Sequence, residues 1–529
     1  MRQPIQLVVP MSGQGHRYRK EGYVEPKPLV PVSGVPMVER VLAGFPAAWP
    51  ATFVLAGNHR DTPLPALLER LRPGAAIRFI APHALGPGRA LADAVLALPP
   101  DAPVFVSYCD YGMAWDAARF ERFVRETACD ACVVSYRGFH AHYLSPVTYA
   151  YSRLDGERVV EVREKGSFTA DREAEYASAG GYYFRTAALL QAALEAQVAL
   201  GLAHDGELYT SLTVEALLRS VPGAHVRVFE IDAFFQWGTP DDLRDFEYWE
   251  RTFTARNRAS GRRGKVDQVL MPMAGRGSRF ASVSRHPKPL IPVAGRPMYR
   301  AALDALPEAG RTVLVALDDI AAGLPRPDGT RVVPLPQTPP GQALSTEAGL
   351  VQLDPAREVL VAACDHALVL HPDRWEAFRA DPACDAAIFT VRGLPAAARS
   401  PASFAWVVPE PGDAPFPVVE RVSVRVPVSA QPRRDAVLVG SFWFASAAVL
   451  ARGIDQLRRR DLRVNGELYL DSVFALLAEA GLRVRSVPLD GCVSWGDPDS
   501  LAEALYWAEV FGGRRPGRRC RFPGVNDDP

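Results

Sequence analysis

Short apolar runs alternate with amphipathic stretches along the first half of the chain. The runs are rich in β-branched residues and are typical of buried strands: QLVVPM (6–11), TFVLAG (52–57), AIRFIAP (76–82), PVFVSYC (103–109) and ACVVSYR (131–137). Between them, PMVERVLAGF (36–45) and RALADAVLAL (89–98) have the spacing of helices. This alternation predicts an α/β fold with a mostly parallel central sheet flanked by helices. Ligands of such folds bind at the carboxyl ends of the strands.

The whole pattern occurs twice. Residues 7–32 read LVVPMSGQGHRYRKEGYVEPKPLVPV, and residues 269–293 read VLMPMAGRGSRFASVSRHPKPLIPV. Later segments recur in the same order: VSYCDYG (106–112) with VAACDHA (361–367), SAGGYYFRT (178–186) with LVGSFWFAS (438–446), and GELY (206–209) with GELY (466–469). We therefore predict two tandem domains. They are expected to span 1–253 and 266–511, with a polar linker at 254–265 and a flexible basic tail at 512–529.

Composition narrows the class of protein. The 529 residues include 60 basic and 60 acidic side chains, so no net charge favours nucleic acid or an anionic membrane as a partner. Hydrophobic residues make up 48% of the chain, enough for a core in each half, yet no run of about 18 apolar residues predicts a membrane span. Seven cysteines do not make a disulfide framework, and we expect a cytoplasmic protein.

A glycine-rich turn follows the first strand of each half. It reads Gly13-Gln14-Gly15 before Arg17, and Gly275-Arg276-Gly277 before Arg279. Bare backbone N–H groups at a turn between a strand and a helix form an anion-binding concavity, and an arginine adds bidentate phosphate contacts. Each turn is followed by Pro-Lys-Pro-Leu, whose prolines stiffen the backbone around Lys27 and Lys288. The combination predicts binding of a nucleoside triphosphate.

On these motifs both halves resemble the sugar nucleotidyltransferase (NDP-sugar pyrophosphorylase) family. The resemblance implies a Rossmann-like, glycosyltransferase-A-like domain. It also implies an enzyme that transfers NMP from a nucleoside triphosphate to a phosphorylated sugar or related alcohol and releases pyrophosphate. The first half, with EGYVEPKPL, EVREKGSF, ASAGGYYF and GELY, is most similar to a subgroup found in loci for surface polysaccharides. We expect a role in surface-polysaccharide or secondary-metabolite synthesis. The number of subunits is not predicted.

The resemblance also implies roles for single residues. Asp110, and Asp365 in the second half, are expected to hold Mg²⁺; the alternative for each is a helix cap. Lys165 is expected to bind the phosphate of the acceptor. Arg17, Lys27, Asp110 and Lys165 are thus the predicted catalytic residues. The remaining candidates are Gly13, Gln14, Gly15, Gly88, Gly275, Arg276, Gly277, Arg279 and Lys288 at the nucleotide, and Gly181 and Glu207 at the acceptor.

Two departures from the family pattern affect these predictions. Many relatives carry a second metal-binding aspartate where this chain has Gln236 and Ser494. In addition, alignment puts Ser423 and Val424 opposite Lys165, with Arg421 or Arg425 as alternative cations. We therefore predict that the first half is catalytic and that the second is impaired.

Two other classes of function remain open from the residues alone. The chain could be a regulatory or scaffold protein that binds nucleotide or activated sugar, with the second half inactive. It could also be a glycosyltransferase on the same fold, although those enzymes usually carry Asp-x-Asp and lack Pro-Lys-Pro-Leu. Pyrophosphate release distinguishes a nucleotidyltransferase from both.

Overall fold

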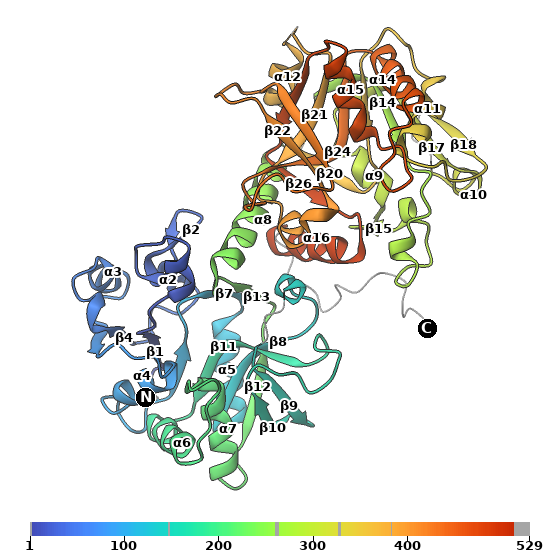
Figure 1. Ribbon diagram of the computed structural model, residues 1–529. Helices are drawn as coiled ribbons and strands as arrows, with labels where there is room; N and C mark the ends of the chain where they lie inside the picture. The colour runs from blue at the N-terminus through green and yellow to red at the C-terminus, as the bar shows by residue number, and fades with distance from the viewer. Residues whose placement is uncertain (1–2, 146–148, 260–263, 326–328, 382, 513–529) are drawn as a thin grey trace. The chain divides into compact units, whose positions relative to one another are not determined.

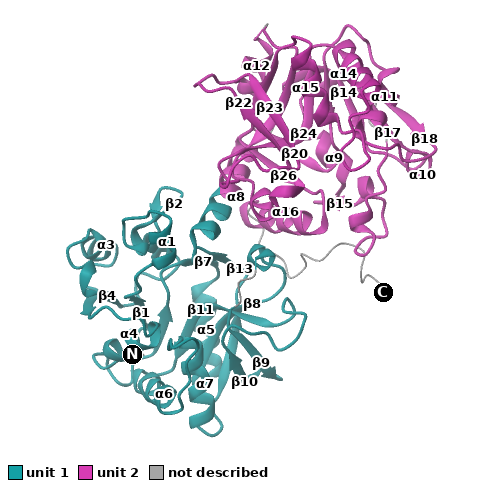
Figure 2. Cartoon of the chain, viewed as in Figure 1, with its two compact units in different colours: residues 1–247, 513–520 teal, residues 248–512, 521–529 magenta. Residues whose placement is uncertain are grey.

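The computed structural model describes residues 3–145, 149–259, 264–325, 329–381 and 383–512. These residues form two compact units (Figure 2). Unit 1 runs to Glu247, and unit 2 runs from Tyr248 to Gly512. Each is described by itself.

A mixed sheet lies at the centre of unit 1 (Figure 1). Nine strands belong to it within the described residues: β1 (Gln6–Met11), β4 (Ala51–Ala56), β5 (Ala76–Ile80), β6 (Val104–Ser107), β8 (Ala131–Tyr136), β9 (Tyr151–Asp155), β10 (Arg158–Arg163), β11 (Tyr176–Phe184) and β12 (Val226–Glu230). Strands β5, β4, β1 and β6 are parallel neighbours in that order. Strand β11 runs antiparallel to β6, β8 and β9. Because β1 and β6 are adjacent and parallel, the turn after β1 and the residues after β6 lie at the same edge of the sheet.

Helices cover both faces of this sheet. Those of unit 1 are α1 (His16–Lys20), α2 (Met37–Ala43), α3 (Leu64–Leu71), α4 (Pro87–Val95), α5 (Ala117–Thr127), α6 (Ala187–Ala199) and α7 (Thr210–Ser220). Val104 and Val106 of β6 point into an aliphatic core beneath α4, α6 and α7. Phe105, on the opposite face, packs its ring against Phe45 after α2 and Phe120 of α5. Two short ladders complete the unit: β2 (Pro31–Val32) with β3 (Val35–Pro36), and β7 (Tyr111–Ala114) with β13 (Ala233–Gln236).

Unit 2 repeats this arrangement. Its strands are β14 (Lys265–Pro272), β15 (Pro292–Val293), β16 (Arg296–Pro297), β17 (Glu308–Leu317), β18 (Thr330–Leu335), β19 (Val359–Ala362), β20 (His366–Val369), β21 (Ala386–Val391), β22 (Ala405–Pro409), β23 (Val419–Val424), β24 (Ala436–Phe444), β25 (Val484–Pro488) and β26 (Gly491–Ser494). Its helices are α9 (Met298–Leu303), α10 (Asp318–Ala321), α11 (Gln342–Leu350), α12 (Pro372–Arg379), α13 (Pro395–Arg399), α14 (Ala447–Arg459), α15 (Val473–Glu479) and α16 (Pro498–Phe511). Parallel neighbours β18, β17, β14 and β19 correspond to β5, β4, β1 and β6.

The predicted α/β class is confirmed in both halves, and each predicted strand is present within a few residues of its expected ends. At the boundary between the halves, regular secondary structure enters the expected linker. Helix α8 (Pro240–Ala259) runs through the first part of the expected linker, and β14 begins at its last residue. Residues 260–263 of that linker and nearly all of the predicted tail lie outside the described residues. The expected domain limits therefore stay predictions.

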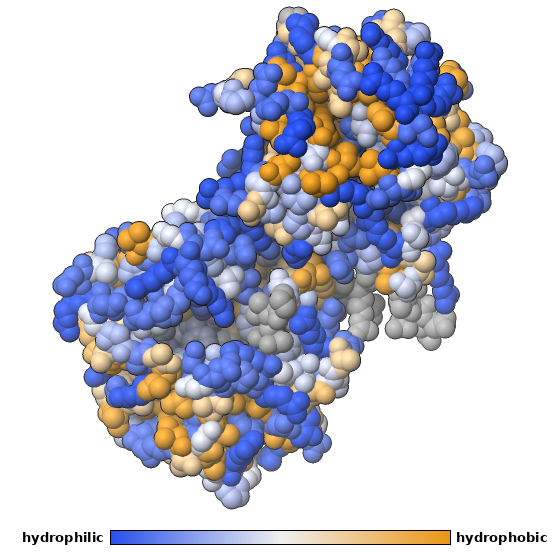
Figure 3. Space-filling model, in the orientation of Figure 1, coloured by the Kyte–Doolittle hydropathy of each residue, from blue (hydrophilic) through white to orange (hydrophobic). Residues whose placement is uncertain are grey.

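The surface of each unit is mainly hydrophilic on the face that Figure 3 shows, with smaller apolar areas between. Exposed large apolar side chains such as Val24, Leu96 and Val351 are far apart in the sequence. Within the described residues, no helix combines the length and the apolar character needed to cross a bilayer.

A glycine in α11 allows close contact between this helix and the sheet of unit 2. A β-carbon added at Gly349 would lie 2.4 Å from Leu270 Cδ1 and 2.9 Å from Val315 Cγ2. We predict that Gly349→Val overpacks this core and destabilises unit 2 by about 1–3 kcal/mol or more. Ala448→Val, which adds bulk at an exposed position of α14, is the control. Urea unfolding of the two variants is the measurement, and equal unfolding midpoints would contradict the prediction.

Candidate active site

The second glycine of each turn brings the turn against the lysine of Pro-Lys-Pro-Leu. Gly15 and Gly277 have φ angles of 62° and 66°, a left-handed conformation that favours glycine. A β-carbon at Gly15 would lie 3.3 Å from Lys27 Cβ, and one at Gly277 would lie 2.5 Å from Lys288 Cβ. Glycine is therefore required here both by the backbone angle and by the approach of the lysine stem.

Each lysine begins a short 3-10 helix, η1 (Lys27–Leu29) in unit 1 and η5 (Lys288–Leu290) in unit 2. The preceding proline carbonyl accepts the N–H of the leucine, at 2.8 Å in both halves. Proline 28 and its counterpart Pro289 are buried. Since the backbone is held on both sides, the direction in which each lysine leaves it is set before any ligand binds.

In unit 1 this direction leads to Asp110. Lys27 Nζ donates to Asp110 Oδ2 at 2.6 Å and to the carbonyl of Gly238 at 2.9 Å. The ammonium also lies 5.4 Å from the ring centroid of Tyr18, whose hydroxyl donates to the carbonyl of Trp237 at 2.7 Å. The fold thus brings together three predicted segments: the glycine turn, the lysine loop and Asp110 after β6.

Unit 2 has the same pair, since Lys288 Nζ donates to Asp365 Oδ2 at 2.5 Å. Burial alone would raise the pKa of Asp365, but the charge of Lys288, with help from His366, outweighs burial and holds that pKa well below its usual range. For Lys288, burial alone would lower the pKa, and Asp365 outweighs it, so the pKa is raised. Both partners are held in their charged forms.

A backbone contact fixes each aspartate. The N–H of Trp237 donates to the carbonyl of Asp110 at 3.0 Å, and the N–H of Trp495 donates to that of Asp365 at 2.7 Å. These bonds continue the β7–β13 and β20–β26 ladders. The two tryptophans are buried, in line with the core role their motif suggests. The segment after each tryptophan therefore forms one wall of the site.

The polar residues of the glycine turns lie nearer the surface. The side chain of Gln14 accepts from Asn58 at 3.3 Å, and its own amide nitrogen is buried without a hydrogen bond among the described residues. At the corresponding place in unit 2, Arg276 pairs with Asp319 at 2.7 Å in an exposed salt bridge. Both partners, Asn58 and Asp319, follow the strand next to the first one.

The two predicted phosphate arginines are exposed. Arg17 lies on α1, and its charge acts on the buried phenol of Tyr149 together with the charges of Asp242 and Asp110. Arg279 acts on the ammonium of Lys288. Each arginine is thus within electrostatic range of groups at its lysine–aspartate pair.

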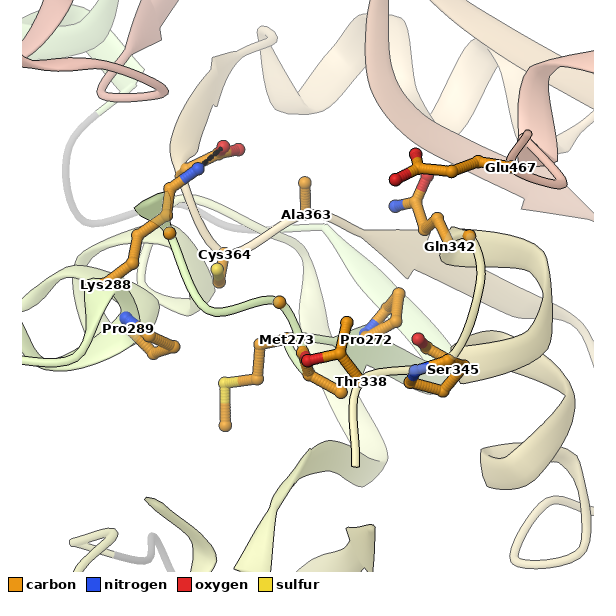
Figure 4. A pocket seen from close by; sticks show the side chains of 16 residues that line it. Pro272, Met273, Lys288, Pro289, Thr338, Gln342, Ser345, Ala363, Cys364 and Glu467 are labelled. Carbon is orange, nitrogen blue, oxygen red and sulfur yellow. Dashed lines mark hydrogen bonds and ion pairs between the residues drawn. The ribbon is translucent and has the colours of Figure 1, made fainter. Parts of the chain in front are cut away.

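A cavity of about 270 Å³ in unit 2 joins these elements (Figure 4). Its lining includes Gly275, Gly277, Lys288 and Asp365, together with Gly341, Gln342 and Glu467 from across the pocket. In the view of Figure 4, Lys288 and Cys364 stand on one side, and Gln342 and Glu467 stand on the other. The predicted nucleotide residues of unit 2 therefore border one space, although Arg276 and Arg279 are not part of its lining.

Lys165 lies at the end of unit 1 where an acceptor is expected. Its Nζ is 4.9 Å from the ring centroid of Tyr209 and 3.7 Å from Asp205 Oδ2. Burial would lower its pKa, but Tyr209 and Asp205 outweigh burial and the pKa is raised. The adjacent Glu164 accepts a hydrogen bond from Ser211, and burial raises its pKa. Lys165 is thus a permanent cation beside a carboxylate.

Two predicted residues, Gly88 and Gly181, sit differently from what the motifs suggest. The N–H of Gly88 donates to the carbonyl of Leu208 at 2.7 Å, and Gly86, not Gly88, begins α4 as Gly341 begins α11. A β-carbon at Gly181 would meet Phe105 and Val134 inside the sheet, so this glycine faces the core. Glu207, by contrast, lies beside Gly86, and its counterpart Glu467 lines the cavity of unit 2.

The family is decided by comparison with known proteins. A model of the MobA-like NTP transferase domain matches residues 7–171 and again residues 270–409, which together exceed half of the chain. The chain belongs to the MobA-like NTP transferase family. The predictions of a nucleotidyltransferase and of two tandem copies are confirmed.

Among solved structures, this transferase is similar to the nucleoside-diphosphate-sugar pyrophosphorylase of Vibrio cholerae RC9, with 17% identity and a TM-score of 0.36 over 46% of this chain and 99% of that one. A putative glucose-1-phosphate thymidylyltransferase of Bacillus anthracis has 16% identity and a TM-score of 0.36 over 46% and 94%. The inositol-1-phosphate CTP transferase of T. maritima has 13% and 0.34 over 46% and 93%. No curated protein matches the chain in sequence.

Asp242 is a site residue that the motifs did not reveal. A β-carbon at Gly238 would lie 3.9 Å from Asp110 Oδ2 and 4.0 Å from Asp242 Oδ2, so both carboxylates border the same glycine. Asp242 Oδ2 accepts from Gln236 at 2.5 Å and from the hydroxyl of Thr239 at 2.5 Å. The sequence showed this residue only as part of a helix start, because spacing alone cannot tell which acid of the first turn faces inward.

The carboxylates of the site suit Mg²⁺ only when a bound ligand supplies further oxygen atoms. Among the described residues, no group of three or more His, Cys, Asp or Glu side chains could hold a metal ion. Asp110 or Asp365 lies beside the turn in each transferase half, and in unit 1 Asp242 borders the same glycine as Asp110. Mg²⁺ is commonly bound by one or two carboxylates, with phosphate oxygens and water as its other ligands. The residues suit a metal that arrives with a phosphate ligand, and they do not suit a cage made by protein alone.

Asp242 generates a prediction on pH. Burial raises its pKa to about 6 from 3.8, against hydrogen bonds from Thr239 and Gln236 that lower it. Because the folded protein binds this proton more tightly than the unfolded chain, stability from this group is full below pH 3.8 and is lost as pH rises through about 6. Asp242→Asn, which keeps an acceptor oxygen, should therefore stabilise unit 1 by about 1–2 kcal/mol at pH 7.5 and by little near pH 4, with a discount for partial exposure.

Urea unfolding at the two pH values measures this difference. Asp241→Asn, an exposed neighbour in the same helical turn, is the matched control and should show no such pH dependence. A gain from Asp242→Asn that is equal at both pH values would show that the carboxylate is not desolvated.

Proposed function

We propose that unit 1 transfers NMP from a nucleoside triphosphate to a phosphorylated sugar or related phosphorylated small molecule and releases pyrophosphate. The observation that carries this proposal is the lysine held between the glycine turn and Asp110, with Nζ 2.6 Å from the carboxylate. Nucleotidyl transfer needs no covalent enzyme intermediate. It depends on positioning and on stabilising charge at phosphorus, and the pair supplies a fixed cation for that purpose.

The triphosphate would lie along the turn. The amides of residues 13–15 and the exposed Arg17 offer donors for the β- and γ-phosphates. The buried amide nitrogen of Gln14, which has no partner among the described residues, adds a donor that a ligand oxygen would satisfy. A glycine turn with these donors is suited to an anion with several oxygens.

Lys27 would act at the α-phosphate. An ammonium has three N–H donors, and the described residues engage two of them, through Asp110 and Gly238. One donor is left for a phosphate oxygen, and its direction is set by the other two. The pair therefore orients the lysine without consuming its capacity to bind a ligand.

Asp110 would hold Mg²⁺ together with phosphate oxygens. When bound, the ion would neutralise charge that develops on the phosphates during transfer. The chain's own contribution is to hold the carboxylate beside Lys27, with Oδ2 2.6 Å from Nζ. Asp242 borders the same glycine and adds a second carboxylate near that place.

Lys165 would bind the phosphate of the acceptor. Its raised pKa keeps it charged, and Tyr209 restricts where the ammonium can move. An oxygen of the acceptor phosphate would form a bond to the α-phosphorus while the bond from that phosphorus to the bridging oxygen of the β-phosphate breaks. The electron pair of that bond leaves with pyrophosphate.

We assign the reaction to the cytoplasm, and its product to surface-polysaccharide or secondary-metabolite synthesis.

The test is a matrix of the four common nucleoside triphosphates against phosphorylated sugars, cyclitols and small alcohols. Pyrophosphate release is followed together with identification of the nucleotide product. We expect at least one pair to give pyrophosphate and the nucleoside diphosphate linked to the acceptor. Release of nucleoside diphosphate from an activated sugar would favour a glycosyltransferase. Nucleotide binding without turnover in any pair would favour a regulatory protein.

Loss of the fixed cation should mainly affect the chemical step. In a chain with the second half silenced by Lys288→Met, we predict that Lys27→Met lowers the pyrophosphate-releasing rate by about 10²–10³, comparable to loss of an oxyanion-hole donor. Lys20→Met, at an exposed position of α1, should leave the rate unchanged. Steady-state rates at saturating triphosphate are the measurement, and equal rates for the two variants would count against the assignment.

Loss of Lys165 should mainly weaken binding of the acceptor. In the same background we predict that Lys165→Met raises KM for the acceptor by about 10- to 100-fold, because a charged hydrogen bond contributes about 1.5–3 kcal/mol. KM for the triphosphate should change little. Initial rates with each substrate varied in turn separate the two constants, and a selective rise in triphosphate KM would reassign Lys165 to the nucleotide.

A further inference from the structure

Arg425 occupies in unit 2 the backbone position that Lys165 occupies in unit 1. Lys165 comes shortly after β10, and Arg425 directly after the corresponding strand β23. Their φ angles are 50° and 59°, a left-handed conformation that side-chain-bearing residues rarely adopt. Each precedes by the same number of residues the glycine at the bulge of the following long strand, Gly180 or Gly440. The register is therefore shifted from the alignment that put Ser423 and Val424 opposite Lys165.

The same tyrosine holds both cations. Tyr209 and Tyr469 each end a Gly-Glu-Leu-Tyr segment. Lys165 Nζ lies 4.9 Å from the ring centroid of Tyr209, and Arg425 Cζ lies 5.8 Å from that of Tyr469. Arg425 Nη2 also donates to the Tyr469 hydroxyl at 3.4 Å. Backbone and ring therefore aim lysine in one half, and arginine in the other, at the same place.

The carboxylate near the cation comes from a different segment in each half. In unit 1, Glu164 precedes the cation and accepts a hydrogen bond from Ser211. In unit 2 the residue before the cation is Val424, and Asp471 stands where Ser211 would be. Burial raises the pKa of Asp471 to about 6, and the charge of Arg425 acts against that rise. Unit 1 thus has Glu164 just after the strand, in addition to Asp205, and unit 2 has Asp471 on the following helical turn. Each half therefore has a cation with at least one acid nearby.

Such a paired exchange is evidence of a maintained site. A half without function has no need of a carboxylate near its cation, yet Asp471 lies near Arg425 where Val424 offers none. The strained backbone at Arg425 would also have been free to relax. Elsewhere in unit 2, Lys288 and Asp365 remain paired beside the glycine turn, in the same cavity as Glu467.

We propose that unit 2 is a second nucleotidyl-transfer site, in which Arg425 binds the phosphate of a phosphate-monoester acceptor. This proposal rests on the function proposed above. The planar guanidinium offers two parallel donors to a phosphate, a geometry that an ammonium lacks. The prediction of an impaired second half rested on the absence of a lysine. Arg425 supplies a cation at the corresponding position.

The walls of the two acceptor sites predict different acceptors. In unit 1, the ring of Tyr108 covers Gly180, and its hydroxyl donates to Thr210 Oγ1 at 2.9 Å. The corresponding residues in unit 2 are Ala363, which lines the cavity, and Leu470. Because alanine has no ring to cover the glycine of the bulge, we expect unit 2 to take a different and bulkier acceptor.

The experiment uses the full chain with the first half silenced by Lys27→Met. We expect this enzyme to release pyrophosphate with at least one pair of the substrate matrix, extended to bulkier phosphate monoesters. In that background, Arg425→Met should raise KM for the acceptor at least tenfold and leave KM for the triphosphate within about twofold. Arg425→Lys should recover part of the loss. Arg421→Met, which removes an exposed arginine from the same strand, should have no effect.

Three results would overturn the proposal. The first is a Lys27→Met enzyme inactive with every pair while the Lys288→Met enzyme keeps full activity; this would leave the function proposed for unit 1 intact. The second is equal KM for the acceptor in Arg425→Met and Arg421→Met. The third is a rise in triphosphate KM alone. Inactivity of the unmodified chain with every pair would instead refute the proposed function itself. Thermal melting of each variant verifies that it is folded.

Discussion

The contact between the Pro-Lys-Pro-Leu lysine and the aspartate after the fourth sheet strand organises each half of this transferase. In unit 1 it joins Lys27, Asp110 and Gly238, which are far apart in the sequence. A partly buried ion pair of this kind adds little to stability once desolvation is counted. Its consequence is geometric. The lysine cannot keep this position unless the glycine turn stays left-handed and the two prolines hold the loop, so the sequence motifs form one mechanical unit.

The two halves begin the corresponding helix with the same kind of hydrogen bond but with acid and hydroxyl exchanged. At the start of α8, the hydroxyl of Thr239 donates to Asp242, three residues later. In unit 2 the order is reversed: Asp497 comes first and accepts from the hydroxyl of Ser500, three residues later. Both arrangements satisfy the first turn of a helix. Only in unit 1, however, is the second of these residues an acid, and it stands beside Gly238. The two halves therefore have equivalent helix starts but a different charge near Asp110 and near Asp365.

Much of the fold and part of the site followed from the sequence. Parallel strands bring their carboxyl ends to one edge, so the proximity of the turn after β1 and of Asp110 could be foreseen from the order of strands. The contact of Gly15 with Lys27 could be foreseen in outline, because a glycine turn and a rigid lysine loop both suit an anion. The strand pairs β9–β10 and β22–β23 could not, since each contains a register shift, after Val159 and after Val408.

Both hairpins have their bulge at the corresponding place, so the bulges do not displace one cation relative to the other. The second cation was hidden by the alignment with Ser423 and Val424. Lys165 and Arg425 lie equally far before SAGGYYFRT and LVGSFWFAS, so the flanking segments give the correct register. The left-handed backbone at both Lys165 and Arg425 costs on the order of 1–3 kcal/mol, and such strain persists only where surrounding structure enforces it. In both halves the tyrosine of Gly-Glu-Leu-Tyr lies against the cation at this position. The cation is therefore specified by the shape of the chain around it, and lysine and arginine are alternative occupants of one position, each suited to its own acceptor.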